Sequence, residues 1–318
     1  MTLCLQPSDV DRSIQALRRD IFIENADAQR IACQIEGSLR EFLAAKELGH
    51  SFDARGVVVL GRSGTGKTKS VLRALETLGL HRTAVGHSPR GHVFVPLRDD
   101  VTLRKLRMLI SLEYGWTPKA RDSAEDIWQY VAAYIERLQT QVLVLDEIQH
   151  VRAAGAKDRQ SMRDALKSLV QPQKGQVIPI LIGTPEFAEI LNSDQQFKRR
   201  YSVVHMTDLD PGIDASRAIK VLARYCRGMG LELGKSVKTR DFAERLLHAS
   251  YYAFGELCEI CILALKAALV ARDKVLEIEH FRSTHAQRFD CLAEMNPFIA
   301  EDFVSIPTDV SLDGRRGL

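Results

Sequence analysis

The most specific motif in this chain is Gly61-Arg62-Ser63-Gly64-Thr65-Gly66-Lys67-Thr68. It fits the phosphate-binding pattern G-x-x-x-x-G-K-[ST] at every position. An apolar run, Val57–Leu60, precedes the stretch, and a segment with helical apolar spacing, Lys67–Leu78, follows it. Because the pattern requires a strand before it and a helix after it, we interpret the stretch as a phosphate-binding loop rather than a chance glycine-rich turn.

Each residue type of the loop has a chemical reason. Glycines let the backbone turn tightly and direct its N–H groups at phosphate oxygens, and the N-terminus of the following helix adds partial positive charge. Lys67 is placed to reach the β- and γ-phosphates, and Thr68 offers its hydroxyl to Mg²⁺. The sequence therefore predicts that ATP and Mg²⁺ bind here, at Gly61, Arg62, Ser63, Gly64, Thr65, Gly66, Lys67 and Thr68.

Two acidic residues, Asp146 and Glu147, directly follow the apolar run Val142–Leu145. A parallel strand buried on both faces carries charges only at its carboxyl end, where open α/β sheets bind ligands. We predict that Asp146 orients Mg²⁺ and that Glu147 polarises the water that attacks the γ-phosphate. The alternative is a strand that merely ends in solvent, which fits less well with a phosphate-binding loop earlier in the chain.

A third apolar run, Val177–Ile182, ends in Gly183-Thr184-Pro185-Glu186. Thr184 can contact the γ-phosphate or its water, or its hydroxyl can simply cap the next helix.

Further along, Lys198, Arg199 and Arg200 precede the last predicted strand, Ser202–Met206. Arg199 or Arg200 can complete the site of a neighbouring subunit, contact DNA phosphates, or belong to a solvated basic loop.

Apolar runs alternate with amphipathic segments between residues 51 and 211, which predicts a parallel sheet covered by helices. After Asp210-Pro211-Gly212 only helical spacing remains. We therefore expect an α/β domain followed by a small all-helical domain. The expected boundaries are 1–50 for an N-terminal helical segment, 51–211 for the α/β domain, 212–303 for the helical domain and 304–318 for a flexible tail.

Composition limits the classes of function. The 318 residues carry a net charge of +3, which is too small to indicate nucleic-acid binding by itself. No apolar run is long enough to cross a bilayer, and the N-terminus lacks the pattern of a secretory signal, so we expect no membrane partner. The six cysteines are scattered, and Cys258 and Cys261 have no second pair at zinc spacing, which favours core thiols in a reducing cytoplasm.

Together these motifs resemble an AAA+ ATPase, and more narrowly the TniB/TnsC group of bacterial transposition regulators, which is related in function to MuB. The resemblance rests on GRSGTGKT, VLVLDEIQH, ILIGTPEF and FKRRY and covers roughly Asp53–Gln287. The first two motifs are common to P-loop proteins, whereas the combination of GTPEF and FKRRY points to this group. The resemblance implies a P-loop AAA+ sheet followed by a small helical lid domain, in a bacterial cytoplasmic protein.

The resemblance also implies partners. Proteins of this group assemble ATP-dependent homo-oligomers, rings or helical filaments, on double-stranded DNA and recruit an integrase-type transposase, often with a TniQ-like adaptor. ATP hydrolysis then drives disassembly. By motif position, the resemblance assigns the nucleotide and catalytic roles to Lys67, Thr68, Asp146 and Glu147, sensor 1 to Thr184, and the arginine finger to Arg199 or Arg200.

One position departs from the family pattern. A sensor-2 arginine commonly stands three residues after a glycine at a helix start, and here Gly255 is followed by Cys258 at that position. The lid is therefore expected to sense the γ-phosphate weakly, or with help from Arg217. This departure bears on the rate of hydrolysis more than on ATP binding.

The segment Thr102–Arg107 carries Arg104, Lys105 and Arg107. The resemblance implies that residues here can face DNA in the pore of a ring; by spacing alone they are the basic side of an amphipathic helix. The leading hypothesis is ATP-dependent, largely sequence-nonspecific DNA binding with slow, regulatory ATP hydrolysis in transposition target selection. The alternatives are a nucleotide-switched signalling or scaffold ATPase that acts on protein partners without DNA, and a small-molecule kinase.

Overall fold

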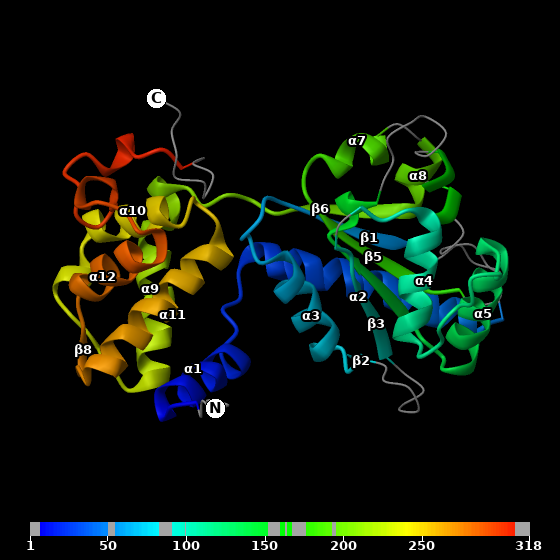
Figure 1. The fold of residues 1–318 in the computed structure, drawn as a ribbon, viewed down its shortest axis with the longest axis horizontal. Helices are drawn as coiled ribbons and strands as arrows, with labels where there is room; N and C mark the ends of the chain where they lie inside the picture. The colour runs from blue at the N-terminus through cyan, green and yellow to red at the C-terminus, as the bar shows by residue number, and fades with distance from the viewer. Residues whose placement is uncertain are drawn as a thin grey trace. The chain divides into compact units, whose positions relative to one another are not determined.

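The computed structural model describes residues 7–49, 55–82, 91–98, 100–151, 160–162, 164–166, 176–192 and 195–308. The chain divides into two compact units (Figure 1). The sheet unit comprises Glu24–Ser63 and Lys67–Thr207, and the helical unit comprises the chain up to Ile23, Gly64–Gly66 and the chain from Asp208 onward. Of the expected tail, residues 309–318 lie outside the described residues.

A six-stranded sheet organises the described part of the sheet unit. Its strands are β1 (Gly56–Leu60), β2 (His81–Arg82), β3 (Gly91–Pro96), β4 (Val142–Asp146), β5 (Ile178–Gly183) and β6 (Tyr201–His205). They are ordered β2-β3-β4-β5-β1-β6, and every neighbouring pair is parallel. The predicted parallel sheet is confirmed, and β5 lies between the strand that enters the phosphate-binding loop and the strand that ends in acids.

Helices flank this sheet. They are α2 (Ala26–Glu47), α3 (Lys67–Thr77), α4 (Leu103–Glu113), α5 (Ala124–Arg137), α7 (Phe187–Asn192) and α8 (Gln195–Arg200). Helix α2 contacts β1, β5 and β6 and packs against α3, whereas α4 contacts β3 and packs against α5 (Figure 1). Strands β1, β4 and β5 are buried along their whole length, as expected for near-continuous apolar runs covered on both faces.

The register of the three central strands brings their carboxyl ends to one edge of the sheet. Leu60 lies opposite Gly183 across the β1–β5 pair, and Leu145 lies opposite Leu181 across the β4–β5 pair. The Gly61 N–H donates to the Gly183 carbonyl at 3.1 Å, which extends the ladder into the loop. The phosphate-binding loop, the acidic residues and the end of β5 therefore emerge side by side.

Helices dominate the described part of the second unit. They are α1 (Asp9–Asp20), α9 (Pro211–Met229), α10 (Arg240–Ala249), α11 (Phe254–Ala271) and α12 (Ile278–Phe289). The structure adds to the predicted helical region a parallel pair of short strands, β7 (Glu232–Leu233) and β8 (Val275–Leu276). Among the residues described, no helix combines the length and the apolar composition needed to cross a membrane.

The expected N-terminal helical segment, 1–50, is divided between the units. Helix α1 belongs to the helical unit, whereas α2 belongs to the sheet unit. Ile14 and Leu17 of α1 are buried in the core of the helical unit, and Arg18 pairs with Glu259 of α11 at 2.5 Å. Helical spacing predicted both helices but not this division, because an apolar face does not specify which core covers it.

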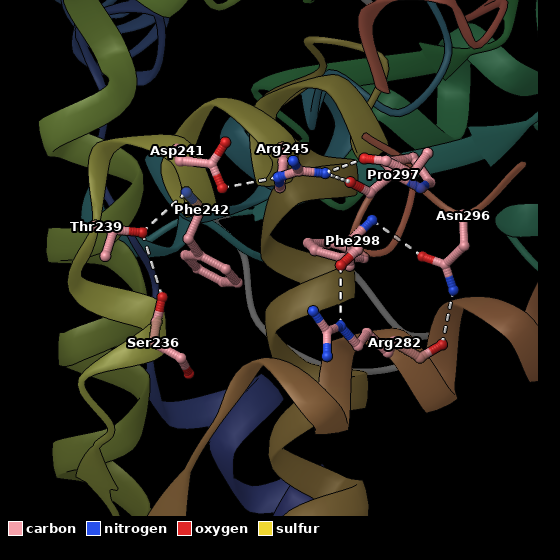
Figure 2. Close-up of polar contacts among 10 residues, drawn as sticks. Ser236, Thr239, Asp241, Phe242, Arg245, Arg282, Asn296, Pro297 and Phe298 are labelled. Atoms are coloured by element: carbon pink, nitrogen blue, oxygen red, sulfur yellow. Dashed lines mark hydrogen bonds and ion pairs between the residues drawn. The ribbon is translucent and has the colours of Figure 1, made fainter. Parts of the chain in front are cut away.

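Side-chain hydrogen bonds connect the segment that follows α12 to α10 and α12 (Figure 2). Arg245 of α10 donates to the Pro297 carbonyl at 2.8 Å. Asn296 is fully buried; it donates to the Arg282 carbonyl at 2.9 Å and accepts the N–H of Phe298 at 3.1 Å. The buried amide therefore joins α12 to the segment that leaves it.

Replacing Asn296 with alanine is expected to lower the free energy of unfolding by about 1–3 kcal/mol, because the Phe298 N–H and the Arg282 carbonyl would lose a buried partner. Urea unfolding followed by circular dichroism measures the change. Glu294→Ala, at an exposed position of the same segment, is the matched control and should stay within about 0.5 kcal/mol of the wild type. Equal stability of the Asn296→Ala variant and the wild type would contradict this role.

Candidate active site

The phosphate-binding loop has a backbone that its glycines allow. Gly64 and Gly66 have φ angles of 78° and 91°, in the left-handed region that residues with a Cβ rarely adopt. Lys67, the first residue of α3, is 5% exposed, and its Nζ donates to the carbonyls of Gly61 and Arg62 at 2.7 and 2.8 Å. The ammonium group therefore lies against the loop rather than in solvent.

Thr68 and Asp146 meet at the edge of the sheet. The Thr68 hydroxyl lies 3.1 Å from Oδ1 and 3.0 Å from Oδ2 of Asp146, to which it donates. Asp146 ends β4 and is 8% exposed. A hydroxyl and a carboxylate in contact form the hard oxygen donor set that Mg²⁺ prefers beside substrate phosphates. These two residues fit the predicted metal and would hold it next to the loop.

Burial and mutual charge set the electrostatics of this edge. Burial lowers the pKa of Lys67, while the charges of Glu147 and Asp146 act to raise it. Burial raises the pKa of Asp146; the Thr68 hydroxyl lowers it, and the neighbouring charge of Glu147 raises it further. The lysine and the two carboxylates therefore interact through a poorly solvated region, as a site for a charged ligand requires.

Glu147 follows β4 in an uncommon backbone conformation. Its φ of 58° and ψ of 46° are left-handed, which costs a residue with a side chain about 1 kcal/mol or more. A 3₁₀ turn, Ile148–His150, follows at once, and Ile148 is fully buried. Strain of this kind is concentrated at functional positions, which supports the predicted action of Glu147 on water.

Sequence reasoning missed one polar residue of the site, Gln149. Its Nε2 donates to Oε2 of Glu147, and its Oε1 accepts the backbone N–H of Thr184 at 3.2 Å. Only its place in the acid-containing motif, shortly after Glu147, could have drawn attention to it. The amide joins the acid at the end of β4 to the end of β5.

The Thr184 hydroxyl has a different partner. It hydrogen-bonds to the carboxylate of Glu186 and lowers the pKa of that group, and the short helix α7 begins at Phe187. The hydroxyl is thus engaged by a neighbouring side chain, and the capping role that the sequence left open for Thr184 stays a prediction. The residue reaches the acidic end of β4 through its backbone N–H, and direct contact of its hydroxyl with the nucleotide stays a prediction.

Arg199 and Arg200 end helix α8 immediately before β6. The Arg199 side chain is exposed, whereas Arg200 is half-buried next to the buried ring of Tyr201. Of the two, Arg199 is therefore the one placed to reach another molecule. The arginine-finger role itself stays a prediction.

The predicted DNA-binding cations lie in the first turns of α4, and two of them have partners within the sheet unit. Arg104 donates to the Asp122 carbonyl at 2.7 Å, and Arg107 donates to the Ala124 carbonyl at 2.9 Å. Arg104 and Lys105 are exposed, and Arg107 is half-buried. The two arginines thus hydrogen-bond to the end of the α4–α5 connection and to the start of α5. DNA contact by Arg104, Lys105 and Arg107 stays a prediction.

The helical unit carries the two residues that bear on the sensor-2 position. Cys258 lies partly buried on α11, where a thiol supplies no fixed positive charge. Arg217 of α9 lies 3.4 Å from a carboxylate oxygen of Asp214 and 5.5 Å from the ring centroid of Phe254. The Arg217 guanidinium therefore has partners within its own unit, and a part in sensing nucleotide stays a prediction.

Several solved structures have the same architecture at low sequence identity. The Cdc6p protein of Pyrobaculum aerophilum matches with a TM-score of 0.58 at 13% identity, over 85% of this chain and 70% of that one. The ORC2 protein of Aeropyrum pernix, solved as ADPNP–ADP complexes, matches with a TM-score of 0.55 at 15% identity, over 89% and 75%. The ORC1 protein of the same organism, solved in complex with DNA, matches with a TM-score of 0.54 at 18% identity, over 82% and 66%. These identities are low, so the likeness establishes the fold alone, which is the AAA+ fold.

The family follows from the sequence. A family model described as the bacterial TniB protein matches residues 13–210, more than half of the chain. The chain belongs to the TniB family, as the resemblance predicted. The matched region contains the phosphate-binding loop, the acidic pair and the end of α8, and a comparison with curated proteins gives no match.

Proposed function

We propose that this chain is a Mg²⁺-dependent ATPase whose nucleotide state controls DNA binding in transposition. The ATPase activity is supported most directly by the residues that lie together at one edge of the sheet. Lys67 lies against the loop, Thr68 contacts Asp146, and Glu147 lies beside them. Membership of the TniB family and the AAA+ fold support nucleotide binding. The loop and its metal ligands would hold the phosphates of a nucleoside triphosphate. We take this nucleotide to be ATP, because a protein with the same fold, ORC2, was solved as ADPNP–ADP complexes.

Each residue has one task in the proposed hydrolysis. The loop N–H groups and Lys67 bind the phosphates, and Lys67 offsets charge that develops on the γ-phosphate. Glu147 accepts a proton from the attacking water while the water oxygen bonds to the γ-phosphorus. The bond from that phosphorus to the bridging oxygen breaks, and its electron pair stays on ADP, giving ADP and inorganic phosphate. Mg²⁺, held by Thr68 and Asp146, would supply neutralising charge when bound.

Double-stranded DNA is the proposed partner of the ATP-bound form. Membership of the TniB family supports this partner, and one protein with the same fold, ORC1, was solved in complex with DNA. Contacts would go to phosphates, with little sequence selectivity, which suits a protein that marks targets. The marked DNA would then recruit an integrase-type transposase, with a TniQ-like adaptor.

The proposed arginine finger requires a homo-oligomer, either a ring or a helical filament, because the arginine of one subunit acts in the site of its neighbour. An arginine that stabilises transition-state charge in a neighbouring site needs an exposed guanidinium. Arg199 is exposed at the end of α8, whereas Arg200 is half-buried. We therefore assign the finger to Arg199.

The test is duplex-DNA binding with ATP, with ADP and without nucleotide, measured by filter binding and by electron microscopy. Complexes containing several subunits should form with ATP and be lost with ADP. Affinity should fall steeply with salt, since about 6–10 phosphate contacts reduce affinity about 10³-fold or more between about 50 and 200 mM salt.

One observation favours the second candidate function, a nucleotide-switched scaffold that acts on protein partners. The guanidiniums of Arg104 and Arg107 donate to backbone carbonyls of their own unit. Fewer positively charged groups are therefore available to bind DNA phosphates. ATP binding without any ATP-dependent DNA complex would support the protein-scaffold function and would contradict the DNA-binding proposal.

A further inference from the structure

Gln149 has both ends of its side-chain amide engaged. The Nε2 donor meets Oε2 of Glu147, and the Oε1 acceptor receives the N–H of Thr184 at 3.2 Å. A carboxylate only accepts hydrogen bonds and a backbone N–H only donates them. The amide therefore has one favourable orientation here, because the reversed amide would repel both neighbours.

The turn that carries Gln149 is fixed at both ends. The His150 N–H donates to the Glu147 carbonyl at 3.0 Å, and the Val101 N–H donates to the His150 carbonyl at 2.8 Å. Val151 then forms a parallel bridge with Val101. The left-handed backbone of Glu147 and this short turn together bring the side chain of residue 149 back to that of residue 147.

Gly183 allows the amide to pack closely against the end of β5. A Cβ on Gly183 would lie 3.0 Å from Oε1 of Gln149 and 2.8 Å from Cγ2 of Ile148, so a side chain there would displace the turn. The Gly183 carbonyl also accepts the N–H of Gly61 at 3.1 Å. Contacts therefore run from the phosphate-binding loop, through the end of β5, to the amide.

We propose that Gln149 is a positioning residue for ATP hydrolysis, which holds the Glu147 carboxylate by Oε2 so that Oε1 accepts the proton of the attacking water. The inference rests on the proposed ATPase function. The amide takes its own orientation from the backbone of Thr184. Glu147, the proposed base, is thus held through Gln149 by the residue that follows β5, and the Gly183 carbonyl at the end of β5 accepts the N–H of Gly61.

Gln149→Met tests both hydrogen bonds together, and Gln149→Glu tests the bond to Glu147 alone. Methionine keeps the length of the side chain and removes both bonds, whereas glutamate keeps an acceptor for Thr184 and sets a like charge beside Glu147. We expect kcat for ATP hydrolysis to fall about 10- to 100-fold in both variants, since a misplaced catalytic group can reduce the rate about 10²-fold. The KM for ATP should stay within about twofold in Gln149→Met, because neither bond involves the loop residues that bind phosphate.

A double-mutant cycle shows whether Gln149 acts through Glu147. In a Glu147→Gln background, Gln149→Met should change kcat by less than about twofold, because the group that it positions has already lost its function. A second loss as large as the first would overturn the inference. Equal losses of ATP affinity and kcat in the Gln149→Met variant would also overturn it, since they would show a structural role.

Gln34 supplies matched controls, because it is exposed on α2. Gln34→Met and Gln34→Glu should hydrolyse ATP at the wild-type rate. Unchanged kcat in both Gln149 variants, beside an active wild type and an inactive Glu147→Gln, would overturn the inference and leave the proposed function standing. A wild type without ATPase activity would overturn both together.

Discussion

Replacing Lys67 with methionine is expected to weaken ATP binding about 100-fold. The ammonium group is buried against the loop, next to the Gly61 and Arg62 carbonyls, where charged hydrogen bonds to phosphate oxygens are strong. A factor of 100 corresponds to about 2.7 kcal/mol, which is the size of one or two hydrogen bonds to a charged group. Isothermal titration calorimetry with ATP and Mg²⁺ measures the change.

The Lys67→Met fold should survive, because removing a buried charge also removes its desolvation penalty, and burial already lowers the pKa of Lys67. The melting temperature should therefore not fall. Lys69→Met is the matched control, since Lys69 is exposed on the same helix, and it should bind ATP like the wild type. A folded Lys67→Met protein with wild-type affinity would show that ATP does not bind at this loop.

The second large effect is expected from Glu147→Gln, which should bind ATP within about twofold of the wild type and hydrolyse it at least about 100-fold more slowly. A neutral amide cannot take the proton of the attacking water, and general bases contribute about 10²–10⁴-fold to a rate. The new amide still offers an oxygen to Nε2 of Gln149, so the surrounding turn should be preserved. Phosphate release at saturating ATP measures the rate.

Slow hydrolysis should also prolong DNA binding, because hydrolysis is proposed to release the DNA. The Glu147→Gln variant should therefore dissociate from duplex DNA more slowly than the wild type after ATP is added. Glu125→Gln, at an exposed position of α5, is the control and should behave like the wild type. Unchanged turnover in Glu147→Gln would mean that another group acts on the water.

The centre of the sheet could be predicted because its determinants are local. Strands β1, β4 and β5 are short apolar runs that are wholly buried, and the glycines of the loop mark where the backbone turns. Parallel strands bring their carboxyl ends to one edge. The contact of Thr68 with Asp146 therefore follows from the two motifs and the sheet together.

Side-chain partners could not be predicted in the same way. No local pattern indicates that Glu147 is left-handed, and without that conformation the amide of Gln149 has no reason to meet the acid. Helical spacing shows which face of α4 is basic, but it does not show that carbonyls before and in α5 lie within reach of Arg104 and Arg107. Such contacts depend on how distant segments pack.

Very short elements were missed for a related reason. Strands β2, β7 and β8 are each two residues long, and two residues cannot display a period of two. Each exists because a neighbouring strand offers a partner, as Glu232 lies opposite Val275 in the β7–β8 pair. Only the assembled fold provides that partner.

Phosphate release from ATP by the wild-type chain, measured with Mg²⁺ and with excess chelator in the presence of duplex DNA, tests whether this site is a Mg²⁺-dependent ATPase. We expect release that requires Mg²⁺, because Thr68 and Asp146 form a metal site next to the loop. The same release should be lost in Glu147→Gln. No release by the wild type, or an equal rate with chelator, would contradict a Mg²⁺-dependent ATPase at this edge of the sheet.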